Sequence, residues 1–176
     1  MYITFRKRIF FFFLSMVFFL FMFYVGYSFK MDESFSKELS KNFINQLGSL
    51  DKIDIFFNNL KIALVMFIPI IGIAMGTISG FSTGLVFNSI LDASGGAVSS
   101  YSNPLIIFLT PFGILEILSY GIAISRSGIL IFEILKREFV KKSFIHLIIE
   151  IMLVSGLLFM GAIIEWMMIE DSFRGV

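Results

Sequence analysis

Glu116 is the side chain whose surroundings most strongly suggest chemistry, because it lies in an otherwise uncharged run over residues 104–125. A carboxylate within a membrane-spanning helix is costly unless it is paired, protonated or in contact with water. Tyr120 follows one helical turn later, where its hydroxyl can donate a hydrogen bond to Glu116. We expect an intramembrane polar contact between them. This contact would serve as a proton or ion relay, or it would fix assembly. Alternatively, Glu116 is a protonated carboxyl that bonds to backbone groups left without a helical partner by Pro111.

The last apolar run, residues 143–169, carries three further titratable side chains. His146 and Glu150 are four residues apart near its start, and we predict that they pair at the membrane interface. Glu165 lies near its far end, where the side chain can reach the lipid headgroups. Glu150 and Glu165 would be about 22 Å apart along one helix. These two alone therefore cannot form a paired-carboxylate hydrolase site.

Motifs for enzyme chemistry are missing from the sequence. The chain has no cysteine and one histidine, which removes thiolate nucleophiles and disulfides and disfavours a zinc or haem site. No serine lies in a GxSxG turn, and no lysine follows the glycine-rich segment as it does in a phosphate-binding loop. The net charge of +1 gives no basis for nucleic-acid binding. We predict a protein that is not an enzyme, with no catalytic residue, cofactor or metal.

The composition places these residues in a membrane. Hydrophobic residues make up 57% of the 176 positions and charged residues only 15%, against about a quarter in soluble domains. The predicted fold is all-α, a polytopic transmembrane helical bundle in the lipid bilayer of the cell membrane. The apolar runs 9–29, 104–125 and 143–169 each suffice for one crossing. The first run is too long for a signal peptide, so residues 1–31 are predicted to be a retained N-terminal anchor.

Residues 32–59 are predicted to hold an amphipathic interfacial helix and a linker. Asp32 can cap this helix, and Glu33 and Lys37 are spaced to pair on its polar side. The helix would lie on the membrane surface or against the bundle, although a solvated linker helix is an alternative. Its apolar face would carry Phe35, Leu39, Phe43, Ile44 and Leu47.

The uncharged run 62–91 determines the number of crossings in the predicted transmembrane core, residues 60–169. One straight helix of this length would measure about 45 Å, well beyond the hydrocarbon core. We expect a break near residues 77–84, where serine and glycine gather, and a kink at Pro111 in the next crossing. The bundle has four crossings if this run passes once and five if it is broken. Residues 170–176 are a short polar tail.

Four glycines in this run recur at every fourth position, which clears side chains from one face of a helix. We expect this glycine stripe to pack against another helix; it consists of Gly72, Gly76, Gly80 and Gly84.

The orientation of the chain in the membrane, as predicted from the distribution of lysine and arginine, depends on whether run 62–91 crosses once or twice. A single pass favours an external N-terminus. Two passes favour an internal N-terminus, with the cluster Arg6, Lys7 and Arg8 on the same side as the basic residues of 136–142.

Three ordered stretches resemble the stage II sporulation protein M family of integral membrane proteins. Asn58 and Asn59 precede the glycine-rich helix, and residues 161–166 contain Glu165 after small residues. Between them, Pro111, Gly113 and Glu116 match a proline, histidine, glycine, glutamate pattern in which Phe112 replaces the histidine. In spore formers the resemblance implies a membrane anchor that works with partner hydrolases in peptidoglycan remodelling.

Two functions follow as expectations. The first is a non-enzymatic scaffold or accessory subunit, which binds other membrane subunits or a second copy of itself through the glycine stripe and the intramembrane carboxylates. The second is a small transporter or channel with a midplane site at Glu116.

Overall fold

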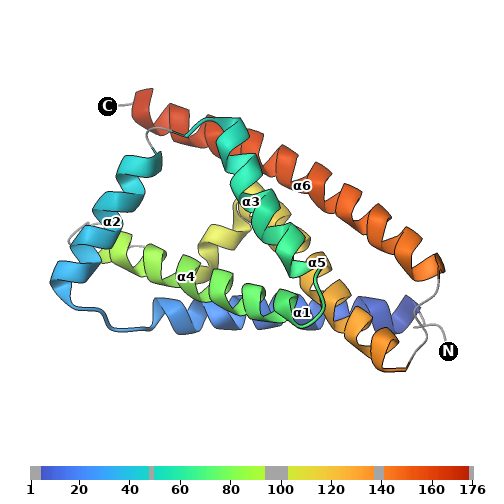
Figure 1. Ribbon diagram of the computed structural model, residues 1–176. Helices are drawn as coiled ribbons and strands as arrows, with labels where there is room; N and C mark the ends of the chain where they lie inside the picture. The colour runs from blue at the N-terminus through green and yellow to red at the C-terminus, as the bar shows by residue number, and fades with distance from the viewer. Residues whose placement is uncertain (1–4, 48–49, 94–102, 137–140, 175–176) are drawn as a thin grey trace.

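The computed structural model describes residues 5–47, 50–93, 103–136 and 141–174. These residues fold into helices without a strand, which confirms the predicted all-α class. Four of the helices, α1, α4, α5 and α6, are long and apolar enough to cross a membrane. In order (Figure 1), the elements are α1 Phe5–Tyr27, α2 Glu33–Leu47, α3 Lys52–Met66, α4 Ile71–Ala93, the 3-10 helix η1 Pro104–Leu109, α5 Pro111–Leu135 and α6 Lys141–Arg174.

Helices α1 and α4 pack closely and run in the same direction. A Cβ atom on Gly80 would lie 3.0 Å from the Phe19 carbonyl oxygen. One turn later on both helices, a Cβ atom on Gly84 would lie 2.1 Å from the Phe23 carbonyl oxygen. Because α1 and α4 are parallel, the chain must return through the bundle between them.

Helix α3 provides this return. Asp51 begins it with a capping box, in which the Asp51 side chain accepts hydrogen bonds from the backbone of Ile53 and Asp54. Fifteen residues give α3 a length of about 22 Å, short of the roughly 30 Å hydrocarbon core. A tight turn at residues 67–70 then connects it to α4, and we call the two helices the α3–α4 hairpin.

The run 62–91 is therefore broken, but not where we expected. Pro69 lacks a backbone N–H and disfavours a helical conformation at Ile68, so the break falls at residues 67–70. Ile70 there has a φ of 70°, and the Ser127 hydroxyl donates to the Ile68 carbonyl at 2.9 Å. Residues 77–84 stay helical, because α1 packs against their glycines.

Helix α5 also differs from the expectation. Pro111 begins α5 rather than kinking it, because Thr110 caps the helix and Pro104–Leu109 forms the separate η1. The helix continues to Leu135, well past the end of the apolar run 104–125 that predicted this crossing.

The bundle has two ends. Figure 1 shows α1 beginning beside the end of α5 and the start of α6, and α1 and α6 finishing toward the opposite end. The first end gathers Arg6, Lys7, Arg8, Lys136, Lys141 and Lys142, and we call it the basic end.

The helix predicted after Asp32 is confirmed as α2, but only part of its predicted apolar face turns inward, where Leu39 and Phe43 are partly buried beside two serines. Ser36 and Ser40 are buried, while Phe35 and Ile44 are 54% and 47% exposed. The Ser36 hydroxyl donates to Asp92 at 3.3 Å, which joins α2 to the end of α4. Small side chains allow this close approach. On the exposed side, the predicted Glu33–Lys37 ion pair is present at 2.6 Å, and it lowers the pKa of the Glu33 carboxyl.

Candidate functional site

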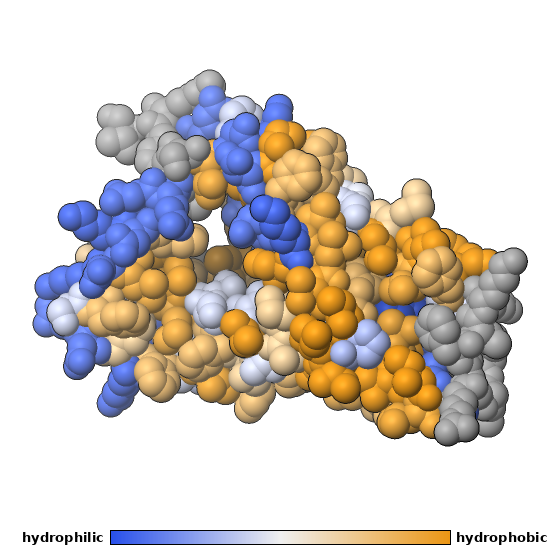
Figure 2. Space-filling model, viewed as in Figure 1, coloured by the Kyte–Doolittle hydropathy of each residue, from blue (hydrophilic) through white to orange (hydrophobic). Residues whose placement is uncertain are grey.

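A cavity of about 300 Å³ lies near the end of the bundle opposite the basic end, between α3, α4, α5 and α6 with α2 at its rim. Figure 2 shows a hollow between the hydrophilic surfaces of α2 and α3. We call this space the carboxylate cavity. Its polar lining consists of Asn58, Asn59, Ser79, Ser82, Thr83, Glu116, Tyr120 and Glu165.

Glu116 enters the cavity from the second turn of α5, closer to the helix start than the sequence suggested. The expected contact with Tyr120 is present, since the Tyr120 hydroxyl faces the Glu116 carboxyl at hydrogen-bonding range. Tyr120 is 1% exposed, and its ring centroid lies 5.3 Å from that of Phe19 on α1. The tightly packed ring holds the phenol in one position, so it can orient the carboxyl.

Glu165 reaches the same cavity from the last part of α6. We expected it to extend to the lipid headgroups, but it lies near enough to Glu116 for the two carboxyl groups to interact electrostatically. The adjacent Trp166 has a different environment, with the Lys52 ammonium 5.4 Å from the centre of its ring. The antiparallel packing of α5 and α6 therefore brings two carboxylates together that are far apart in the sequence.

Asn58 and Asn59 also line the cavity, from the middle of α3. They lie inside a helix rather than before one, because α3 begins earlier, at the Asp51 capping box. In this position the asparagines present amide donors and acceptors to the space that Glu116 faces.

Pro111 and Gly113 shape the site without lining it. Pro111 occupies the first turn of α5, where its missing N–H costs no hydrogen bond. A Cβ atom on Gly113 would lie 2.3 Å from the Ile107 carbonyl oxygen, so only glycine lets η1 pack this closely against α5. Phe112 lines the cavity beside them.

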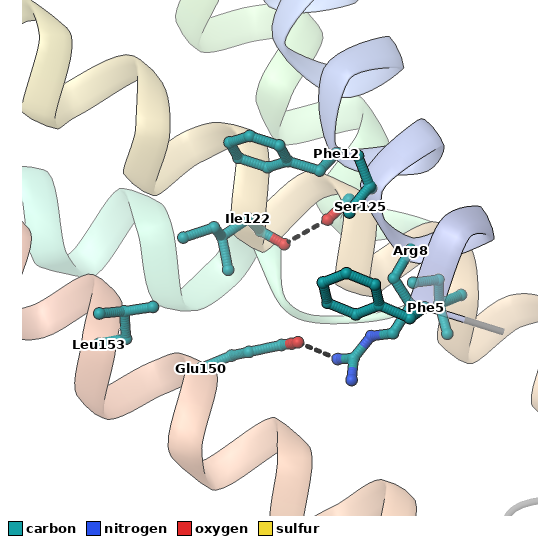
Figure 3. Close-up of a pocket in the computed structure, with 9 residues that line it drawn as sticks. Phe5, Arg8, Phe12, Ile122, Ser125, Glu150 and Leu153 are labelled. Carbon is teal, nitrogen blue, oxygen red and sulfur yellow. Dashed lines mark hydrogen bonds and ion pairs between the residues drawn. The ribbon is translucent and has the colours of Figure 1, made fainter. Parts of the chain in front are cut away.

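A second polar cluster, near the basic end, was missed by sequence reasoning. Glu150 accepts hydrogen bonds from Arg8 on α1 and from Arg126 on α5, with Arg126 Nη2 at 2.7 Å from Glu150 Oε1. Figure 3 shows Glu150 reaching from α6 toward Arg8. We had predicted His146 as the partner of Glu150; His146 lies half-buried one turn earlier on α6. Arg126 is only 2% exposed, and an arginine in so apolar a run requires an anionic partner, a signal that the sequence contained.

The glycine stripe packs helices together as predicted, but within this chain. Gly80 and Gly84 lie against α1, whereas Gly76 faces α5, where its Cβ atom would lie 2.5 Å from Ile124 Cδ1. A Cβ atom on Gly72 would lie 2.7 Å from the Ser127 Cβ atom, also on α5. All four glycines are buried, so the stripe does not offer a surface to another subunit.

The chemistry available in the carboxylate cavity is that of oxygen and amide ligands. In the part of the chain that the structure describes, no group of three or more His, Cys, Asp or Glu side chains gathers as a metal site. Two carboxyl groups with hydroxyl and amide neighbours suit a proton, a monovalent cation or an ammonium group.

Comparison of the chain with protein-family models, curated proteins and solved structures gives no match. The resemblance to the stage II sporulation protein M family therefore stays a prediction from its motif residues. Four of these residues line one cavity, although they come from three different helices: Asn58, Asn59, Glu116 and Glu165.

Proposed function

We propose that this chain is a non-enzymatic multi-pass protein of the cell membrane that binds a small cation in the carboxylate cavity and passes it across the bilayer as a transporter. The observation that carries the proposal is the convergence of Glu116 and Glu165 on one cavity. Two carboxylates that line one partly enclosed cavity repel unless a proton or a cation lies between them. The pair therefore favours a positively charged occupant.

The surroundings of the pair support a binding role over a purely structural one. A structural pair of acids needs only each other and a shared proton, but this cavity adds two asparagines and three hydroxyl side chains from α4, which are Ser79, Ser82 and Thr83. These groups can replace water around a cation that has left solution. Hydroxyl, amide and carboxylate oxygens from separate helices are the usual means of holding an ion inside a membrane.

The path from this cavity to the basic end is blocked by apolar side chains. Met66, Ile124 and Leu158 are buried between the cavity and the Arg8–Glu150–Arg126 cluster, at 0%, 4% and 2% exposure. An open channel would need a continuous polar path. The arrangement supports a transporter whose site communicates with one side at a time, rather than a pore.

The α3–α4 hairpin is the element suited to such a change. Its turn contacts Ser127, one residue from Arg126, while its two helices contribute Asn58, Asn59 and Thr83 to the cavity. A shift of the hairpin would therefore act on both the site and the apolar barrier. Discontinuous helices serve this purpose in known transporter folds.

The test is cation-coupled flux in proteoliposomes. Purified chain is reconstituted in vesicles that contain a dye sensitive to protons, Na⁺ or K⁺, and an inward gradient of that same cation is imposed. We expect a gradient-driven rise in the internal concentration of one cation that is lost in Glu116→Gln and in Glu165→Gln. Glu38→Gln is the matched control, because Glu38 is an exposed carboxylate on α2 outside the cavity. Vesicles whose response equals that of protein-free vesicles under all three gradients would exclude the transport function.

An accessory subunit remains the second candidate, and one observation favours it. The outer face of α6 is strongly apolar, with Met152 and Ile149 at 70% and 57% exposure, and the other face of α6 packs mainly against α3 and α5. Either lipid or a partner helix covers this face. Affinity purification in mild detergent distinguishes the two. A stoichiometric membrane partner that is lost on Met152→Trp, together with no flux in vesicles, would favour the accessory role.

A further inference from the structure

A groove near the basic end has no role in the proposed transport. It lies where α1 and α6 flank α5, encloses about 290 Å³, and has Arg8 and Glu150 as its charged lining residues. Its floor is one stripe of α5 made by Ile122, Ser125 and Ile129. We call it the α1–α6 groove. Figure 3 shows its walls, with Phe5 and Phe12 on one side and Leu153 on the other.

The charged part of the groove has an excess of positive charge. Two guanidinium groups, those of Arg8 and Arg126, face the single carboxylate of Glu150. Arg126 is buried and bonds to both oxygens of that carboxylate. Arg8 is the partly exposed member, with 26% of its side chain accessible. Arg8 is thus the cation that an incoming anion can reach.

Most of the remaining lining is apolar, and the part made by Phe12, Ile122 and Leu153 leads toward the middle of the bilayer. Phe12 lies one turn deeper than Arg8 on α1, and Leu153 lies about one turn deeper than Glu150 on α6. Leu153 is 51% exposed, so it faces the lipid side of the helix. A cation at the interface followed by an apolar path into the membrane matches the order of headgroup and acyl chain in a phospholipid.

We propose that the α1–α6 groove binds an anionic phospholipid, with the phosphate at Arg8 and one acyl chain against Phe12 and Leu153. A zwitterionic lipid offers the same chain but lacks the net charge. A free phosphate offers the charge but cannot use the apolar walls. The proposal requires only that the chain lies in a bilayer, so it stands or falls independently of cation transport.

The test places a fluorescent reporter in the groove. Trp166, the one natural tryptophan, is removed by Trp166→Phe, and Leu153→Trp then adds a single tryptophan at an exposed groove position. The protein is reconstituted in phosphatidylcholine vesicles that contain a small fraction of brominated lipid, which quenches nearby tryptophan. We expect brominated phosphatidylglycerol to be enriched beside the introduced tryptophan about fivefold over brominated phosphatidylcholine, as one additional charge contact implies.

Arg8→Gln should abolish this preference, while Lys7→Gln, which removes the same charge from the exposed neighbouring position, should retain most of it. Arg126 still neutralises Glu150 in Arg8→Gln, and unchanged thermal unfolding would confirm that the fold is intact. Equal quenching by the two lipids would overturn the proposal. So would equal losses in the two variants, which would indicate general surface attraction. Full displacement by millimolar inorganic phosphate would assign the site to the free anion instead.

Discussion

Glu116 on α5 and Glu165 on α6 face each other across the carboxylate cavity, and the Tyr120 hydroxyl contacts the first of them. This relationship gives the two acids different surroundings. The Glu116 carboxyl is next to the Tyr120 phenol, which Phe19 holds in place, whereas the Glu165 carboxyl interacts electrostatically with that of Glu116. Removing Glu165 should therefore relieve repulsion while leaving the Glu116–Tyr120 contact in place.

We predict that Glu165→Gln stabilises the protein in detergent at high pH and changes little at low pH. At high pH both carboxylates are ionised and repel, whereas at low pH one or both carry a proton and the repulsion vanishes. The expected gain near pH 9 is about 1 kcal/mol. Thermal unfolding of wild type and variant at pH 5 and pH 9 measures it. If the stability difference between Glu165→Gln and wild type is the same at pH 5 and pH 9, the electrostatic contact between Glu116 and Glu165 is contradicted.

Gly84 should tolerate no side chain, because its Cβ position lies 2.1 Å from the Phe23 carbonyl oxygen and 2.6 Å from the Tyr27 nitrogen. Both atoms are backbone and cannot rotate away. Gly84→Ala must therefore separate α1 from α4, and we expect a loss of about 2 kcal/mol or more.

Gly128 provides the matched control for this substitution. It also lies within a helix, but nothing lies within 4 Å of its Cβ position. Gly128→Ala should stabilise the protein by up to about 1 kcal/mol, since alanine favours the helix. Unfolding in a series of denaturing detergent mixtures compares the two. Equal effects at both positions would indicate that α1 and α4 do not pack as described.

The ion cluster allows a third prediction. Glu150→Ala leaves Arg126 buried without its carboxylate, and breaking a buried pair in this way costs about 3 kcal/mol. Adding Arg126→Met removes the unpaired charge and should recover part of the loss. The same unfolding assay measures single and double variants as a cycle. If the double variant is as unstable as the sum of the singles, the two residues do not interact.

The sequence predicted those features that depend on local pattern and on the energetics of transfer into lipid. The helical class, the amphipathic helix after Asp32 and the contact between Glu116 and Tyr120 all follow from composition or from one-turn spacing. The glycine stripe was likewise predicted to pack closely against a helix, because a row of residues without side chains lets a second helix approach the backbone.

The remaining features depend on which helices become neighbours. No spacing within α6 indicates that Glu165 lies beside Glu116, or that Glu150 meets Arg8 and Arg126 rather than His146 alone. The break in run 62–91 does have a local signal, which is Pro69, because proline cannot donate a helical hydrogen bond whereas a packed glycine stays helical.

The orientation of the bundle follows from the α3–α4 hairpin. Because α3 returns the chain toward the basic end, Arg6, Lys7 and Arg8 lie at the same end as Lys136, Lys141 and Lys142. The positive-inside rule then predicts that this end faces the cytoplasm, with α2 and the opening of the carboxylate cavity on the outer side.

The absence of cysteine makes this orientation directly measurable. Lys7→Cys and Lys41→Cys each introduce one exposed thiol, at the basic end and on α2 respectively. In intact cells, a membrane-impermeant maleimide should label Lys41→Cys and should reach Lys7→Cys only after lysis. The reverse pattern would place the cavity on the cytoplasmic side, and a transported cation would then bind first from within the cell. Labelling of both thiols in intact cells would mean that α1 does not cross the membrane.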